Sequence, residues 1–183
     1  TYSLSMTNKS NVDNDLGYNL AMSFSKTKVA VLRGGTSPGY DDSLKTGGFI
    51  LSLIREMPES YEPVDIFVSK DDEWHDAGLT EEPHKILSRA DVVWNTLHGP
   101  YGEDGRVQRL LENLQIPFIG SGALSSVFSN NKALAKKLYR ENLRDTPASE
   151  LMDEENFSDE KGGAVLRKYL YPVVVKPADG VKA

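Results

Sequence analysis

The stretch DVVWNTLHGPYGEDG, residues 91–105, joins an apolar β-type run to a loop with unusual side chains. The run ends in His98, and the loop that follows contains three glycines, a proline and the adjacent carboxylates of Glu103 and Asp104. An ordinary turn needs far fewer special residues. The stretch therefore predicts a buried strand that ends at a functional loop.

Strand patterns and helix patterns alternate on both sides of this stretch. Short β-branched runs separate segments in which apolar residues recur at helical spacing, and this alternation predicts an α/β fold whose parallel sheet has helices on both faces. A short edge hairpin is expected within 71–78, and a helix cap at Asn130 or Asn131. The expected strands are 28–35, 64–69, 91–97 and 116–122, and the expected helices are 43–57, 81–90, 107–114 and 123–142.

A second glycine-rich loop, GGTSPGYDDSLKTG at 34–47, also links a strand end to a helix start. In a parallel sheet the carboxyl ends of the strands share one edge, where ligands collect. The two loops are therefore expected to converge on one site, in which His98 can donate to a phosphate or a carboxylate. Glu103 and Asp104 are more simply explained as first-turn carboxylates that complement a helix dipole.

Composition excludes several classes of function. The 183 residues contain 21 Lys and Arg against 27 Asp and Glu, and the net charge of -6 argues against a nucleic-acid partner. The chain has no cysteine, which excludes disulfides, thiolate catalysis and Cys-ligated zinc. It shows no apolar run long enough to cross a membrane and no secretory signal, so a cytoplasmic location is expected.

The two ends of the chain differ in composition from its centre. Residues 1–27 are polar and aperiodic, which predicts a flexible extension, and Met22 is a candidate start site. Residues 144–163 are acidic and predict a mobile linker with a weak helix, most clearly over 150–163. YPVVVKPADGVKA, 171–183, predicts a strand that carries Lys176 and opens a further domain. The expected units are 1–27, 28–143 and 144–183.

Three segments together resemble D-alanine-D-alanine ligases, which are ATP-grasp enzymes. They are VAVLRGGTSPGYDDSLKTG, LHGPYGEDGRVQRLLENLQIPFIGSGALSSVFSNNKALAKKL and YPVVVKPADG, and the resemblance covers about residues 28–180. The set is highly specific, although the first loop alone would be a weak signal. The resemblance implies a Rossmann-like pre-ATP-grasp domain over 28–143, followed by an incomplete, truncated start of the central ATP-grasp domain.

The resemblance also implies a reaction and the residues that serve it. One D-alanine carboxylate attacks the γ-phosphate of ATP, and the amine of a second D-alanine displaces the acyl phosphate, in peptidoglycan precursor synthesis. His98 matches the catalytic histidine, and Lys132 and Lys176 match the two ATP-binding lysines. Mg²⁺ is expected, with ligands in a C-terminal part beyond this sequence, so no metal ligand is assigned here. D-alanine and ATP are the expected partners, and a homodimer is left open.

The chain departs from the family pattern at the first substrate. Where the family has a glutamate that binds the ammonium group, this chain has Gly39, and Asp41 or Asp42 is the candidate replacement. Ser121 is a candidate to face the same substrate. The sequence therefore predicts weak binding of the first D-alanine, which Gly39→Glu would improve about ten- to a hundredfold. Asn131 replaces an aspartate, and the serine-bearing phosphate loop after Lys176 is not found.

Two interpretations follow. In the first, the chain is a piece of a D-alanine-D-alanine ligase, and 183 residues alone are expected to show no turnover. In the second, it is a non-catalytic relic or interaction module, in which Lys132 and Lys176 are ordinary surface lysines. A dinucleotide-dependent oxidoreductase is disfavoured, because GGTSPG is not G-x-G-x-x-G and no acidic ribose-binding residue follows at the expected spacing.

Overall fold

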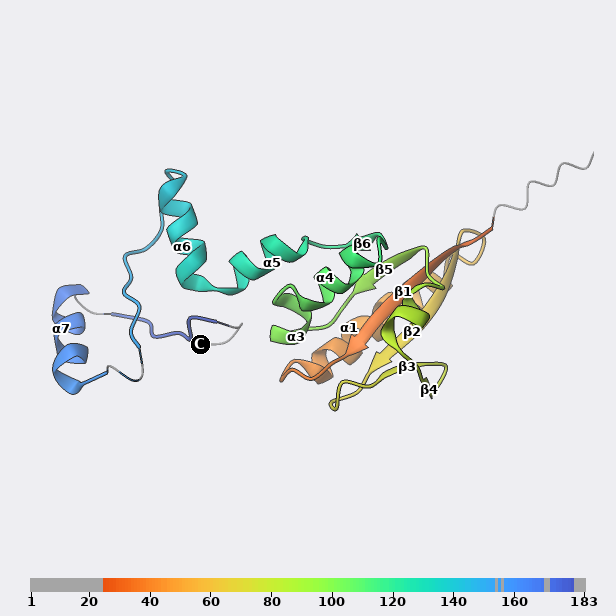
Figure 1. Cartoon of the computed structure of the whole chain (residues 1–183), viewed down its shortest axis with the longest axis horizontal. Helices are drawn as coiled ribbons and strands as arrows, with labels where there is room; N and C mark the ends of the chain where they lie inside the picture. The colour runs from red at the N-terminus through yellow and green to blue at the C-terminus, as the bar shows by residue number, and fades with distance from the viewer. Residues whose placement is uncertain (1–24, 154, 156, 170–171, 180–183) are drawn as a thin grey trace, which may run out of the picture.

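The computed structural model describes residues 25–153, 155, 157–169 and 172–179 (Figure 1). Strands and helices alternate through its N-terminal part, as the sequence predicts. The strands are β1 (Thr27–Gly34), β2 (Tyr61–Val68), β3 (Trp74–Asp76), β4 (Leu79–Thr80), β5 (Val92–Asn95) and β6 (Phe118–Ile119). The helices are α1 (Tyr40–Arg55), α2 (Pro83–Leu87), α3 (Pro100–Glu103), α4 (Arg106–Asn113), α5 (Ala123–Asn130), α6 (Lys132–Glu141) and α7 (Asp159–Tyr169).

The strands form one six-stranded sheet in the order β4-β3-β2-β1-β5-β6. β1 pairs in parallel with both β2 and β5, and β5 pairs in parallel with β6. β3 and β4 add an antiparallel hairpin at the edge next to β2. The predicted parallel sheet with an edge hairpin is therefore confirmed, and the carboxyl ends of β1 and β5 lie side by side.

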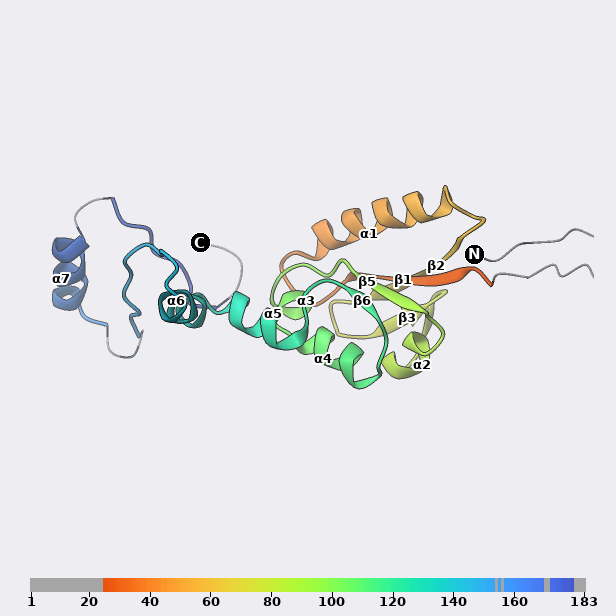
Figure 2. The same ribbon diagram turned by 90° about the horizontal axis from the view of Figure 1, so that it is seen from above.

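Helices cover both faces of the sheet (Figure 2). Because side chains alternate along a strand, β1 contributes to both layers. Val29 and Val31 pack with Leu51 and Ile54 of α1 on one face. On the other face a larger cluster under α2 and α4 includes Leu32, Ile66, Trp74, Ile86, Leu87, Val107 and Leu111. Two layers of apolar packing thus hold the strand ends in fixed positions.

Helix α1 begins at Tyr40, three residues earlier than the sequence pattern predicts. Asp41 and Asp42 therefore lie in its first turn rather than in a loop. A first turn suits carboxylates, because the positive end of the helix dipole lies there. The first glycine-rich loop is correspondingly shorter than expected.

The strand expected at 171–183 does not form within the described residues 172–179. Their one β pairing is an isolated bridge between Asn131 and Asp179. Val174 and Val175 are 75% and 84% exposed. A strand is stable when it has hydrogen-bonded neighbours and an apolar face to bury, and among the described residues no strand pairs with these exposed valines.

The C-terminal helices meet the expectations only in part. Asn131 caps α6, because its side-chain oxygen accepts a hydrogen bond from the backbone N–H of Leu134, which confirms the predicted cap. The weak helix expected in 144–163 is α7, which begins at Asp159 and continues to Tyr169. The expected flexible extension 1–27 lies outside the described residues except for 25–27. None of the helices in the described part of the chain has the length and apolar character to cross a membrane.

Candidate active site

Two glycine-rich loops meet at the carboxyl ends of β1 and β5. The loop after β1 contributes Ser37, whose buried hydroxyl oxygen accepts a hydrogen bond of 2.9 Å from the backbone N–H of Tyr101 on α3, the short helix within the glycine-rich segment after β5. The same region brings Gly39 against His98. The predicted convergence of the two loops is therefore confirmed, and it is set by hydrogen bonding and by close backbone approach.

Gly39 leaves no room for a side chain. A Cβ atom at this position would lie 2.7 Å from the Cβ of His98 and 3.2 Å from its backbone carbonyl carbon and oxygen. The φ of Gly39 is -77°, a value that any residue can adopt, so the constraint is contact and not conformation. Gly39 is therefore one of the residues that let the two loops touch, together with Gly99, where a Cβ would lie 2.8 Å from the Cβ of Ser37.

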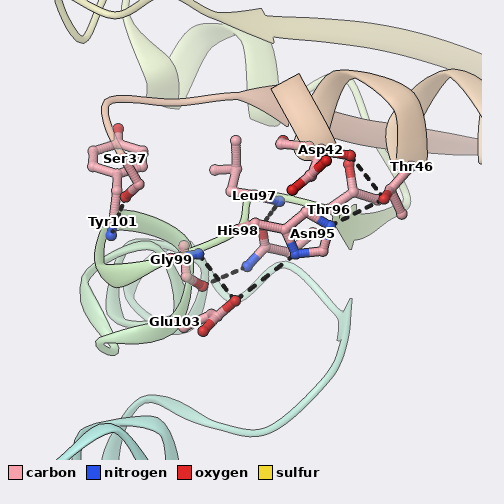
Figure 3. A network of polar contacts seen from close by, with 12 residues as sticks. Ser37, Asp42, Thr46, Asn95, Thr96, Leu97, His98, Gly99, Tyr101 and Glu103 are labelled. Atoms are coloured by element: carbon pink, nitrogen blue, oxygen red, sulfur yellow. Dashed lines mark hydrogen bonds and ion pairs between the residues drawn. The ribbon is translucent and has the colours of Figure 1, made fainter. Parts of the chain in front are cut away.

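His98 lies between α1 and α3 (Figure 3). Its Nε2 is 3.0 Å from the Oγ1 of Thr46 on α1, and its Nδ1 is 3.8 Å from the Oε1 of Glu103 on α3. The side chains of His98 and Glu103 are each 40% exposed, so the ring is held by the protein but remains open to solvent. The structure therefore places His98 where the two glycine-rich loops meet, in contact with α1 and α3.

Glu103 is a first-turn carboxylate, as expected, but of the short helix α3 and not of α4. It ends α3, and its Oε1 accepts a hydrogen bond of 3.0 Å from the backbone N–H of Gly99. Asp104 does not lie in a first turn, because it precedes Gly105, the N-cap of α4, although its Oδ1 accepts a hydrogen bond from the backbone N–H of Arg106. Glu103 thus fixes the loop that carries His98.

Three side chains that were not singled out from the sequence, two at the end of β5 and one on α4, form hydrogen bonds around the loop. The Nδ2 of Asn95 and the Nε2 of Gln108 both donate to the backbone carbonyl of Gly102, at 2.9 and 2.7 Å. The hydroxyl of Thr96 donates to the carbonyl of Leu32 across the β1–β5 pair. A polar N-T pair at the end of an apolar strand is the sequence signal that would have pointed to Asn95 and Thr96.

Tyr101 ties the same loop to the edge of the sheet. Its hydroxyl donates to the Oδ1 of Asp72 and accepts a hydrogen bond of 3.2 Å from the Nε1 of Trp74. Burial raises the pKa of Tyr101, and the hydrogen bond to the Asp72 carboxylate raises that pKa further. The phenol therefore stays protonated at neutral pH and acts as a structural donor.

The predicted substrate-binding residues lie in different surroundings. Asp41 and Asp42 are both exposed in the first turn of α1, but only Asp42 is four residues before Thr46 and so shares its helix face. Figure 3 shows Asp42 beside Thr46 and above the His98 loop. Ser121 is exposed just before Gly122, the N-cap of α5.

The two predicted ATP-binding lysines belong to the C-terminal part of the chain. Lys132 is the first residue of α6, and its backbone N–H donates to the carbonyl of Ala178 at 2.8 Å. Lys176 is exposed two residues before that carbonyl. The structure thus brings the segment that carries Lys176 to the start of α6, whereas the cluster around His98 is built from α1, β5 and α3.

The described residues contain no group of three or more His, Cys, Asp or Glu side chains placed to hold a metal ion. The charged side chains of the two glycine-rich segments are Asp41, Asp42, Lys45, Glu103 and Asp104, and of these Glu103 lies 3.8 Å from the His98 ring.

Comparison with known proteins identifies relatives over most of the chain. The family model "D-ala D-ala ligase N-terminus" matches residues 77–121, which include β5, His98 and the loop that follows. The D-alanine-D-alanine ligase B of Chromobacterium violaceum is 36% identical over 153 residues, which are 82% of this chain and 45% of that protein. The chain therefore spans about half the length of the curated relatives it matches.

Solved structures agree with this match. The D-alanine-D-alanine ligase from Bacillus anthracis complexed with ATP has a TM-score of 0.65 at 32% identity, over 84% of this chain and 48% of that one. The VanG D-Ala:D-Ser ligase from Enterococcus faecalis has a TM-score of 0.66 at 26% identity, over 85% and 53%. The part of the chain that matches the family model of the ligase N-terminus is residues 77–121. On sequence and fold together, the chain belongs to the D-alanine-D-alanine ligase family.

Proposed function

We propose that the chain is part of an ATP-dependent ligase that joins two D-alanines through an acyl phosphate in peptidoglycan precursor synthesis. The observation that carries this proposal is the position of His98, which lies where the two glycine-rich loops meet and is held between Thr46 and Glu103. That position lies at the carboxyl ends of parallel strands, where α/β folds bind ligands. The names of the relatives supply the substrates.

We propose different roles in the reaction for the histidine and the lysines of this chain. His98 can donate a hydrogen bond to the phosphate or the carboxylate that reacts. Lys132 and Lys176 are proposed to hold phosphates of ATP, because an ammonium group is a compact donor on a flexible stem. When bound, Mg²⁺ would neutralise phosphate charge. We assign it no ligand among the described residues.

The ammonium group of the first D-alanine needs a carboxylate, and Gly39 does not supply one. Of the two neighbouring aspartates, Asp42 is better placed than Asp41, because Asp42 shares a helix face with Thr46 and so with the His98 ring. An exposed ion pair with Lys45, 3.6 Å away, leaves the Asp42 carboxylate accessible. We therefore propose Asp42 as the group that meets the first substrate, with Ser121 as a further polar contact.

The domain division is also a proposal. Residues 28–143 would form the pre-ATP-grasp domain, 1–27 an extension, and 144–183 a linker with the start of the central ATP-grasp domain. The exposed valines of 172–179 support this division, since an apolar segment without a paired neighbour fits a strand that belongs to a larger unit. The proposed location is the cytoplasm, where ATP is available, and a homodimer remains an option.

A second candidate function is a non-catalytic interaction module. Gly39 favours this candidate. Where the family has a glutamate that binds the substrate, this chain has a glycine, and the second loop packs so closely against it that no side chain fits. The two candidates differ in one measurable respect, which is dipeptide formation.

The experiment uses the product of the gene that encodes this chain, incubated with ATP, Mg²⁺ and D-alanine. We expect D-alanyl-D-alanine and phosphate, detected by mass spectrometry and a phosphate assay. His98→Gln is expected to lower the turnover number about a hundredfold or more, the usual effect of losing a positioned proton donor. His84→Gln is the matched control, because His84 is exposed on α2, away from the two loops.

A folded gene product that forms no dipeptide from D-alanine, or from D-alanine with D-serine, would support the interaction module instead. Equal losses in His98→Gln and His84→Gln would show that His98 has no special part in the reaction.

A further inference from the structure

Thr46 contacts His98 although the two residues are 52 positions apart in the sequence. The Oγ1 of Thr46 lies 3.0 Å from the Nε2 of His98 and 2.9 Å from the backbone carbonyl oxygen of Asp42, one helical turn earlier. Both distances are within the range of a hydrogen bond. One hydroxyl group is therefore shared between a helix carbonyl and the imidazole ring.

The number of protons decides the direction of these two bonds. A threonine hydroxyl has one proton to donate and two lone pairs to accept with, whereas a carbonyl oxygen can only accept. The contact with Asp42 is therefore a hydrogen bond only if Thr46 is the donor. The oxygen of Thr46 is then the acceptor toward His98, and the proton of that second bond must come from Nε2.

The opposite arrangement is less favourable. If Thr46 donated to an unprotonated Nε2, two oxygen lone pairs would face each other at 2.9 Å, between Thr46 and Asp42. In the favoured arrangement the unprotonated Nδ1 of a neutral ring faces the Glu103 carboxylate, but at 3.8 Å. Repulsion falls with distance, and Glu103 Oε1 already accepts the backbone N–H of Gly99 at 3.0 Å. The 2.9 Å contact between Thr46 and Asp42 therefore outweighs the 3.8 Å contact between His98 and Glu103, and it favours a proton on Nε2.

We propose that Thr46 is a positioning residue that holds the His98 ring with a proton on Nε2, so that Nδ1 is the basic nitrogen of the neutral ring. Nδ1 is not hydrogen-bonded to Glu103, because their 3.8 Å contact is longer than a hydrogen bond, and the His98 side chain is 40% exposed. The use of that nitrogen in ligation rests on the proposed function, whereas the position of the proton does not.

The test is the ¹⁵N spectrum of the imidazole rings in the 183-residue chain, recorded above the pH at which His98 loses its charge. The ring signals are assigned with His98→Gln. In the wild type we expect Nε2 at the shift of a protonated nitrogen and Nδ1 at that of an unprotonated one. In Thr46→Val, which keeps the shape and removes the hydroxyl, the two shifts should move toward each other. Thr46→Ser should restore the wild-type positions.

Thr80→Val is the matched control, since the Oγ1 of Thr80 lies 3.2 Å from the Nδ1 of His75. It should leave the His98 signals unchanged. A proton on Nδ1 in the wild type would overturn the proposal whether or not any variant folds. So would unchanged His98 shifts in a folded Thr46→Val. Because the readout needs no turnover, failure of the proposed ligase activity would not affect it.

Discussion

Gly102→Ala is expected to lower the free energy of unfolding by at least about 3 kcal/mol, because the added methyl group has no space. A Cβ at position 102 would lie 2.1 Å from the carbonyl oxygen of Leu97 and 2.5 Å from its carbonyl carbon. The first two atoms it meets belong to the backbone, so no side-chain rotation relieves the contact. The carbonyl of Gly102 also accepts from Asn95 and Gln108, so a shift of this residue strains both bonds.

The measurement is urea unfolding followed by circular dichroism, with Gly48→Ala as the matched control. Gly48 lies within α1, and a Cβ added there would meet no atom within 4 Å. This change should therefore stabilise the chain by about 0.5–1 kcal/mol, because alanine favours a helix over glycine. Equal unfolding midpoints for Gly102→Ala and the wild type would show that the loop after β5 is not packed as described.

Gly39→Glu is expected to destabilise the chain by about 1–3 kcal/mol and to displace His98, because its Cβ would overlap that of His98. This expectation replaces the sequence-based one, in which a glutamate at position 39 improves binding of the first D-alanine. A new carboxylate has little value if the atom that carries it pushes the histidine out of place. Weaker function and lower stability should therefore appear together.

Gly39→Ala separates the two effects, because it adds the Cβ without the charge. Both variants should lower the urea midpoint and change the ring ¹⁵N signals of His98, whereas Gly48→Ala should do neither. If Gly39→Ala were as stable as the wild type and Gly39→Glu improved D-alanine kinetics in the gene product, the close approach at Gly39 would not be the constraint described here. The family-based role of the position would then hold.

Local pattern was enough to predict the layered architecture. Apolar runs such as VDIFVS and DVVW alternate with segments of helical spacing, and this order restricts the chain to a parallel sheet covered on both faces. The same reasoning placed His98 at a strand end and a helix cap at Asn130 or Asn131, of which the structure has Asn131. Each of these features depends on neighbours a few residues away, and so the sequence contains it directly.

The tertiary structure decided what the candidate site consists of. Thr46 meets His98 across 52 residues, and Ser37 meets the backbone of Tyr101 across 64. These contacts exist because β1 and β5 are neighbours in the sheet, a pairing that no local pattern specifies. From the sequence, Gly39 was interpreted as the loss of a substrate-binding carboxylate. In the fold, Gly39 lies against His98 and leaves no space for a side chain. The difference arises because the space available to a side chain depends on the opposite loop, which only the folded chain brings near.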